Sequence, residues 1–270
     1  MDQTEARIWL IEKLKNENPV YRRVPVPDDE AKQKELLRAL MNVRDAKPVS
    51  AEFRAVQDAY LKREALLKGI VSVDSLEPCP LDSRLCLWQG DITRLAADAI
   101  VNAANFTLLG CFIPLHNCID NCIHSAAGVQ LRWDCHEIMR RQGHDEPTGT
   151  AKITPGHCLP AKYVLHTVGP IVDMGLTDEH RELLTSCYRS CLDLAAENGL
   201  GNVAFCCIST GVFCFPAEEA ARIAVKTVRD WLDSHDSSIN KVIFNVFGNR
   251  DKEIYEKLLG WDRCERSLKK

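Results

Sequence analysis

Short apolar runs alternate with longer stretches of helical periodicity from about Val71 onward. Apolar runs of roughly four to eight residues are typical of buried strands. The predicted strands cover residues 85–88, 99–101, 163–168, 203–209 and 242–247. The predicted helices cover about 120–142, 178–198 and 216–235, and a last helix follows Asp251. Strands that alternate with helices predict a largely parallel or mixed sheet covered on both faces.

The first 70 residues have a different pattern, in which apolar positions mark three short amphipathic helices. Ile8, Ile11 and Leu14 mark the first helix, which Pro19 ends. Residues 36–41 mark the second, and 53–67 the third, for which Ser50 is the expected N-cap. The sequence therefore predicts an N-terminal helical extension over 1–70 and an α/β domain over 71–270.

Composition excludes several classes of function. The formal net charge of −4 is not that of a chain with a basic nucleic-acid-binding face. The longest apolar runs fall short of a membrane span, and the N-terminus lacks the pattern of a signal peptide. We therefore expect a cytoplasmic protein without nucleic-acid or membrane partners, in which the thirteen cysteines are buried thiols or metal ligands.

Three loops that follow predicted strands carry candidate ligand-binding groups. Asp91, after Gly90, can accept a hydrogen bond from an exocyclic amine such as that of adenine, although this segment taken alone favours a helix N-cap. Asn102 and Asn105 can bind hydroxyl groups, but asparagine is common in loops. The third loop can present backbone N–H groups to a diphosphate and comprises Ser209, Thr210, Gly211, Val212 and Phe213.

Cys111, His116 and Cys118 place two sulfurs and one imidazole within eight residues. Two thiolates and a neutral imidazole balance the charge of Zn²⁺, and three protein ligands leave the fourth tetrahedral position open, as in catalytic zinc sites. The alternative is a set of small apolar cysteines beside a surface histidine. Spacing alone does not separate these two interpretations.

In combination, these segments resemble the macrodomain family. The matching segments are G-D-I-T at 90–93, V-N-A-A-N at 101–105, I-D-N-C-I-H at 119–124, L-P-A-K-Y-V-L-H-T-V-G-P at 159–170 and S-T-G-V-F at 209–213. The resemblance covers about residues 73–262. It implies a three-layer α/β/α fold with a mixed sheet that holds ADP-ribose in a cleft.

The resemblance also implies roles for individual residues. Asp91 would bind the adenine amine beside the backbone N–H of Ile92, and Phe247 would pack on the adenine ring. Asn102 and Asn105 would surround the distal ribose, and residues 209–213 would wrap the diphosphate. Asp120 would act as a general base or orient water near the scissile bond, with Asn105 in the same catalytic group; capping of the following helix is the alternative role for Asp120.

The segment at 110–118 replaces the glycine run of common hydrolytic macrodomains. It resembles the loop of zinc-dependent bacterial macrodomains, whose ligands match Cys111, His116 and Cys118, and this resemblance favours one Zn²⁺ per chain. Those relatives also have an N-terminal helical extension. They are associated with a sirtuin-type ADP-ribosyltransferase that modifies a lipoyl-carrier protein resembling the glycine-cleavage H protein.

The expected function is therefore zinc-dependent hydrolysis of ADP-ribose ester-linked to aspartate or glutamate side chains of a modified protein. One alternative is a non-catalytic ADP-ribose reader, which needs neither the zinc loop nor Asp120. A second is hydrolysis of a small derivative such as O-acetyl-ADP-ribose. A third is a structural zinc module, which would require a fourth protein ligand.

Overall fold

A computed structural model describes residues 1–261 and contains one seven-stranded sheet in the order β2-β3-β9-β8-β5-β7-β6. The strands are β2 (Pro78–Cys79), β3 (Asp82–Gln89), β9 (Lys241–Val246), β8 (Asn202–Phe205), β5 (Ala99–Ala104), β7 (Tyr163–Val168) and β6 (Ala151–Pro155). The inner strands from β3 to β7 are parallel, and β2 and β6 run antiparallel at the two edges. The mixed sheet predicted from the apolar runs is confirmed.

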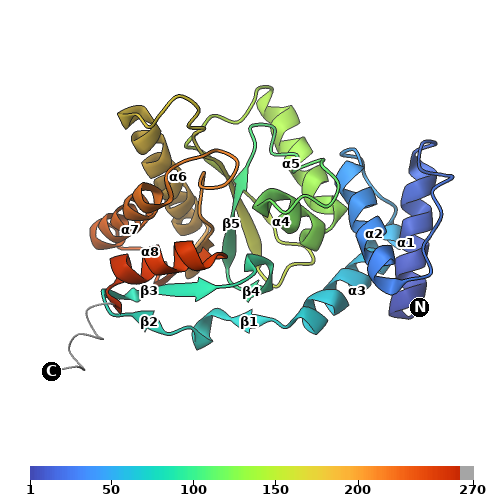
Figure 1. The fold of residues 1–270 in the computed structure, drawn as a ribbon, viewed down its shortest axis with the longest axis horizontal. Helices are drawn as coiled ribbons and strands as arrows, with labels where there is room; N and C mark the ends of the chain where they lie inside the picture. The colour runs from blue at the N-terminus through green and yellow to red at the C-terminus, as the bar shows by residue number, and fades with distance from the viewer. Residues whose placement is uncertain (262–270) are drawn as a thin grey trace.

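Helices cover both faces of this sheet. They are α4 (Ile119–Ala127), α5 (Val129–Gln142), α6 (Asp178–Glu197), α7 (Ala217–Ser234) and α8 (Asn249–Leu259). In Figure 1, α6, α7 and α8 lie on one side of β5, and α4 and α5 lie on the other. This is the predicted α/β/α arrangement. Within residues 1–261, no helix combines the length and the apolar character that crossing a membrane requires.

The predicted helix at 120–142 is wrong in one respect, because Gly128 divides it into α4 and α5. Gly128 has φ 95° and ψ 170°, which only glycine adopts readily. A Cβ at this position would lie 2.6 Å from Nε2 of Gln57, so the break packs tightly against the N-terminal extension. The predicted strand at 203–209 is also shorter than expected, because β8 ends at Phe205. The short strands β1 (Val71–Ser72) and β4 (Leu95–Ala96) and the edge strands β2 and β6 were not predicted.

The N-terminal extension consists of three helices that share a small core. They are α1 (Gln3–Glu17), α2 (Glu30–Val43) and α3 (Ala51–Lys68), as predicted. Ser50 is the N-cap of α3, since its hydroxyl accepts from the Phe53 N–H at 3.1 Å. Two predicted apolar positions are exposed instead: Ile8 at 36% and Leu67 at 62%.

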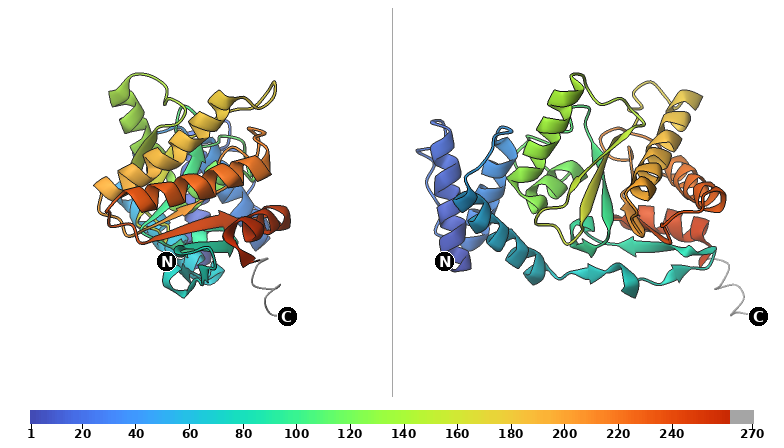
Figure 2. Two further views of the ribbon diagram at one scale, coloured as in Figure 1. Left: turned by 90° about the vertical axis from the view of Figure 1, so that its left-hand side faces the viewer. Right: turned by 180° about the vertical axis from the view of Figure 1, so that it is seen from behind.

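The extension packs against the α4–α5 side of the domain (Figure 2). Val129, the first residue of α5, belongs to the core of the extension. The buried Gln57 side chain of α3 accepts from the Val129 N–H at 3.1 Å and donates to Oε1 of Gln130 at 2.5 Å. A side chain of the extension therefore caps α5. The boundary at 70/71 stays a prediction, although β1 already pairs with β4 directly after it.

Candidate functional site

Most of the sequence-predicted binding residues follow the carboxyl ends of parallel strands, where ligands bind in open α/β sheets. Gln89, the last residue of β3, pairs with Val246, the last residue of β9. The Gly90 N–H also donates to the Val246 carbonyl at 2.9 Å. Asp91 and Phe247 therefore lie just beyond adjacent strand ends. The Phe247 ring is 81% exposed, so its face is free to pack on a planar ligand.

Asp91 caps the short 3₁₀ helix at Ile92–Arg94, as the alternative interpretation proposed. Its Oδ1 accepts from the Thr93 N–H at 3.0 Å and from the Thr93 hydroxyl at 2.7 Å. Lys68, the last residue of α3, forms an ion pair with Oδ2. Burial raises the pKa of Asp91, but the bonds from Lys68 and Thr93 outweigh it and lower the pKa below its ordinary value. The side chain of Ile92 is buried in the core.

Asn102 and Asn105 converge on Asp120. The Asn102 amide donates to Oδ1 of Asp120 at 2.8 Å, and the Asn105 amide donates to Oδ2 at 3.2 Å. Burial raises the pKa of Asp120 to about 6, and these two amides together with the charge of Arg132 limit the rise. Each carboxylate oxygen thus has a donor that favours the anion.

Asp120 lies in the first turn of α4, where the helix dipole also favours a negative charge. It does not cap the helix, so that alternative role is wrong. The N-cap is Cys118, whose sulfur accepts from the Asn121 N–H at 3.4 Å. The Asp120 carboxylate instead meets the Asn102 and Asn105 amides, which leaves it available for chemistry.

His166 anchors this network from within the sheet. It pairs with Asn102 across β5 and β7, and its Nδ1 lies 3.2 Å from the Asn102 amide nitrogen. Its Nε2 lies 2.9 Å from the Thr154 hydroxyl on β6. Burial lowers the pKa of His166 to about 4, so the ring is neutral. His166 is a fully buried core residue, and its contact with Asn102 also ties it to the site.

A second cluster of potential metal ligands, His124, Cys135 and His166, is fully buried. Both ring nitrogens of His166 already have polar neighbours, so this cluster fits a packed core rather than a metal site. Burial also lowers the pKa of His124 well below its ordinary value. Neither His124 nitrogen finds a hydrogen-bond partner within the described chain, and Nε2 lies 3.5 Å from Oδ1 of Asp120.

Cys111, His116 and Cys118 come together as the predicted metal centre requires. Their ligand atoms all lie within 4.8 Å of one another, and Sγ of Cys111 is 3.6 Å from Nδ1 of His116. Zinc bonds of about 2.0–2.3 Å in tetrahedral geometry give ligand–ligand distances of about 3.6 Å. All three side chains are half-buried. The donor set and its spacing therefore fit Zn²⁺.

The diphosphate loop predicted at 209–213 has the conformation of an open backbone turn. Ser209 has a positive φ of 64°, and the Cys214 N–H closes the turn onto the Gly211 carbonyl at 3.0 Å. The buried Ser209 hydroxyl has no hydrogen-bond partner among residues 1–261. A Cβ at Gly169 would lie 2.0 Å from this hydroxyl, so glycine is required there for Ser209 to keep its place. Thr210 and Phe213 are half-buried, whereas Gly211 and Val212 are exposed.

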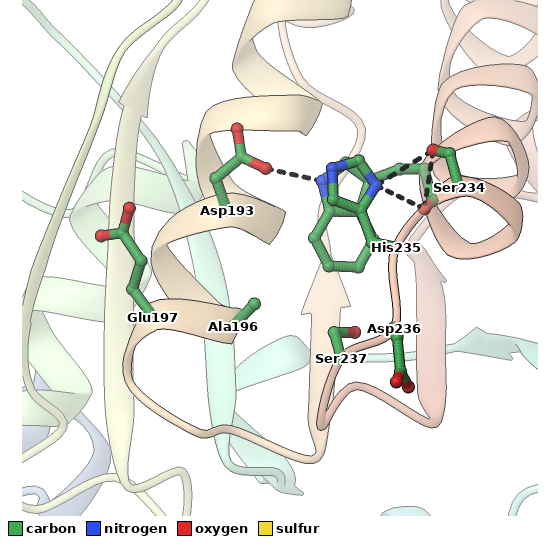
Figure 3. Close-up of a pocket in the computed structure, with 8 residues that line it drawn as sticks. Asp193, Ala196, Glu197, Ser234, His235, Asp236 and Ser237 are labelled. Atoms are coloured by element: carbon green, nitrogen blue, oxygen red, sulfur yellow. Dashed lines mark hydrogen bonds between the residues drawn. The ribbon is translucent and has the colours of Figure 1, made fainter.

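A hollow of about 470 Å³ lies elsewhere, between the C-terminal ends of α6 and α7 (Figure 3). Trp231 stacks on His235 there, with ring centroids 4.4 Å apart, and its indole N–H donates to Asp193 at 2.6 Å. None of the predicted site residues lines this hollow. We assign it no part in the chemistry at the strand ends.

Three residues that contact the site were not singled out from the sequence. Lys68 binds Asp91, Asn121 binds the loop of Cys111 and Cys118, and Arg38 binds the His116 carbonyl. Lys68 and Arg38 belong to the N-terminal extension, far from their partners in sequence. No local pattern could have identified Lys68 or Arg38, whereas Asn121 lies within the I-D-N-C-I-H segment at 119–124.

Comparison with known proteins identifies the family. Residues 101–224 match the model of the Macro domain. A protein-ADP-ribose hydrolase of Treponema medium is 56% identical over 96% of this chain and 100% of its own length. The chain therefore belongs to the macrodomain family.

Two further relatives extend this comparison. The macrodomain of Trypanosoma brucei, solved in complex with ADP-ribose, is 33% identical and superposes with a TM-score of 0.65 over 83% of this chain and 95% of its own. A Fusarium oxysporum protein named as a probable bifunctional ADP-ribose hydrolase/ADP-ribosyltransferase is 44% identical over 83% of this chain, which spans 40% of that protein.

Proposed function

We propose that this protein is a zinc-dependent hydrolase that releases ADP-ribose from aspartate and glutamate esters on modified proteins. The observation that carries the proposal is the Asp120 carboxylate, held between the Asn102 and Asn105 amides. The hydrolase named in Treponema medium matches along its whole length. A module that only binds ADP-ribose has no need of a buried, oriented carboxylate beside a set of zinc ligands.

Different residues along the cleft would contact the adenine, the diphosphate and the distal ribose. Asp91 would accept from the adenine amine through the lone pairs that Lys68 and Thr93 leave free, and the exposed Phe247 ring would cover the adenine. The turn that contains Gly211 and Val212 would receive the diphosphate through its backbone N–H groups. These contacts would place the distal ribose toward Asp120.

Asp120 would orient a water molecule and accept its proton as that water attacks the anomeric carbon of the ribose. The bond from that carbon to the ester oxygen would break, and the aspartate or glutamate carboxylate would leave. Asn102 and Asn105 would keep both carboxylate oxygens fixed while this happens. Cys111, His116 and Cys118 would hold Zn²⁺, which when bound supplies an open coordination position that orients a ribose hydroxyl or water as a Lewis acid. Two thiolates weaken that acidity, so we assign the metal centre mainly to positioning the sugar.

The partners proposed are ADP-ribosylated protein, a sirtuin-type ADP-ribosyltransferase and a lipoyl-carrier protein resembling the glycine-cleavage H protein. Support for a transferase partner comes from the Fusarium oxysporum relative, whose name combines both activities in one chain. A cytoplasmic location is also proposed. The cysteines at residues 79–214 are all free thiols, which fits a reducing compartment.

The decisive experiment compares linkages. Purified protein is incubated with proteins that carry labelled ADP-ribose on aspartate or glutamate esters and, separately, on arginine, and with O-acetyl-ADP-ribose. The expected result is release from the ester-linked protein and none from arginine. If the protein binds ADP-ribose but cleaves none of the three substrates, it is a reader. If it cleaves O-acetyl-ADP-ribose alone, its substrate is the small ester.

A further inference from the structure

The loop that carries the proposed metal ligands, residues 110–118, contains a strained turn. Leu115, directly before His116, has a φ of 58°. Non-glycine residues rarely adopt this left-handed conformation, and it persists only where surrounding contacts impose it. The position of the His116 side chain therefore depends on whatever holds the backbone at Leu115.

Helix α2 of the N-terminal extension supplies the first of these contacts. The Leu115 N–H donates to Oδ1 of Asn42 at 3.0 Å. The Asn42 amide in turn donates to the Ser125 hydroxyl on α4 at 2.9 Å, and the Asn42 side chain is buried. Since both ends of the amide have partners, Asn42 is fixed between the strained turn and α4.

Arg38 lies one helical turn before Asn42 on the same face of α2. Its Nη2 donates to the His116 carbonyl at 2.8 Å and to Oδ1 of Asn121 at 2.9 Å. The buried Asn121 amide donates to the Ile113 carbonyl at 3.0 Å and to the Cys111 carbonyl at 3.4 Å. Arg38 thus binds one ligand residue directly, and through Asn121 it reaches the backbone of a second.

We infer that Arg38 and Asn42 are positioning residues for the metal loop, so that the N-terminal extension forms part of the metal centre. The inference rests on the zinc centre proposed above. Neither residue is a metal ligand. Asn42 fixes the Leu115 N–H and Arg38 fixes the His116 carbonyl, so that the ligand atoms keep the spacing that zinc requires without first ordering a flexible loop. A flexible loop would lose conformational entropy on binding the metal, and that loss would lower metal affinity.

The alternative is that these contacts only attach the extension to the domain. Attachment also uses the contact of Gln57 on α3 with Val129 at the start of α5, which is not beside the metal loop. Loss of attachment would lower global stability and leave the loop itself unchanged. Loss of positioning would change the loop and the release of metal while the melting temperature stays nearly constant.

The test uses full-length Arg38→Gln, which removes the charge and the forked donor, and Asn42→Ala. Arg54→Gln is the matched control, since Arg54 is an exposed arginine on α3. Zinc-loaded proteins are mixed with a chromogenic chelator, and the rate of zinc transfer is measured. Hydrogen exchange of residues 109–118 is measured in the zinc-free proteins, with α7 as the internal reference.

We expect zinc transfer from Arg38→Gln and Asn42→Ala to be at least about tenfold faster than from wild type, equivalent to about 1.4 kcal/mol. Exchange at 109–118 should rise in both variants and not in α7, and Arg54→Gln should match wild type. The zinc transfer rate of Arg38→Lys should lie between those of Arg38→Gln and wild type, because the lysine amine can still reach the His116 carbonyl.

Unchanged zinc transfer and unchanged exchange at 109–118 in both variants would overturn the inference. Increased exchange in α7 to the same extent would overturn it as well, because that result indicates global destabilisation. If wild-type protein binds no zinc, the proposed metal centre fails. Hydrogen exchange in the zinc-free proteins then tests the positioning role by itself. Faster exchange confined to 109–118 in the two variants supports positioning by Arg38 and Asn42, and unchanged exchange refutes it.

Discussion

Asn102 on β5 lies directly opposite His166 on β7, and its amide nitrogen is 3.2 Å from Nδ1 of the imidazole. The same amide nitrogen donates to Asp120 at 2.8 Å. The amide nitrogen of Asn102 can only donate, so His166 must accept from it at Nδ1. The remaining ring proton is then on Nε2, which donates to the Thr154 hydroxyl. The buried sheet thereby fixes the rotamer of Asn102, and Asn102 fixes one oxygen of the Asp120 carboxylate.

The first prediction concerns Asp120. Asp120→Asn keeps the shape of the side chain but removes its ability to accept a proton. Hydrolysis of an ester-linked substrate should fall by about 10²-fold or more, the scale of a lost general base. Affinity for ADP-ribose should stay within about tenfold, because the interaction lost acts in the transition state. Turnover and calorimetric binding measured on one preparation test this, and equal losses in both would contradict a catalytic role.

The second prediction concerns metal content. Elemental analysis of purified protein should find about one zinc per chain. Cys118→Ser should lower this stoichiometry, because the serine hydroxyl is a poor ligand for zinc. Cys214→Ser is the control, since Cys214 is exposed and lies outside the ligand cluster. A stoichiometry near zero in wild type, or one unaffected by Cys118→Ser, would rule out this site.

The third prediction separates two roles of Asp91. Asp91→Ala should weaken ADP-ribose binding by about 1–3 kcal/mol, the cost of leaving a donor of the ligand unpaired. Lys68→Ala removes only the ion pair, whose lysine is half exposed, so it should alter affinity by less than about 1 kcal/mol. Isothermal calorimetry on both variants makes the comparison. Equal losses would indicate that the ion pair, not the adenine contact, supports binding.

The fourth prediction concerns the N-terminal extension. A chain that begins at Val71 lacks the carbonyls of Met41 and Asn42, which accept from the buried Arg132 at 3.2 and 2.9 Å. Removal of the extension also uncovers Val129, which is buried in its core, and burial of a valine side chain contributes about 1.5–3 kcal/mol. A change of 1 kcal/mol corresponds to about 2–4 °C. Together with the loss of the Gln57 cap, the melting temperature should fall by about 5 °C or more. An unchanged melting temperature would show that the extension is a free appendage.

The fifth prediction concerns pH. The pKa of His166 is lowered to about 4 by burial, against the opposing charge of Glu146, while an unfolded histidine titrates near 6.5. The unfolded state therefore binds more protons between these values, and stability falls as pH drops from about 6.5 to about 4. The slope from one such group reaches about 1.4 kcal/mol per pH unit.

Urea denaturation of wild type and His166→Gln between pH 7 and 4.5 measures this slope. The variant should show a shallower dependence, whatever its absolute stability. Part of the dependence should remain, because the pKa of His124 is lowered in the same direction. Identical slopes would mean that His166 does not carry the effect.

The sequence by itself determined the five parallel inner strands of the sheet, most helix boundaries and the three helices of the extension, but not the edge strands β2 and β6. These follow from local periodicity, since the spacing of the apolar residues in an element indicates whether one or both of its faces are buried. It also determined that Cys111, His116 and Cys118 share one loop, because ligands within a segment of eight residues cannot move far from one another. The segments after the strands were informative because the carboxyl ends of parallel strands meet at one edge of a sheet.

The tertiary structure alone decided what supports those residues. The division of the helix at Gly128 reflects tight packing against Gln57 of the extension, a contact between segments about 70 residues apart. Asp120 meets the Asn102 and Asn105 amides instead of capping α4, because α4 packs against β5. Arg38, Asn42 and Lys68 reach the site only because the extension packs beside α4. The spacing of residues along the sequence does not indicate such long-range pairs, because only the packing of the extension on the domain brings them into contact.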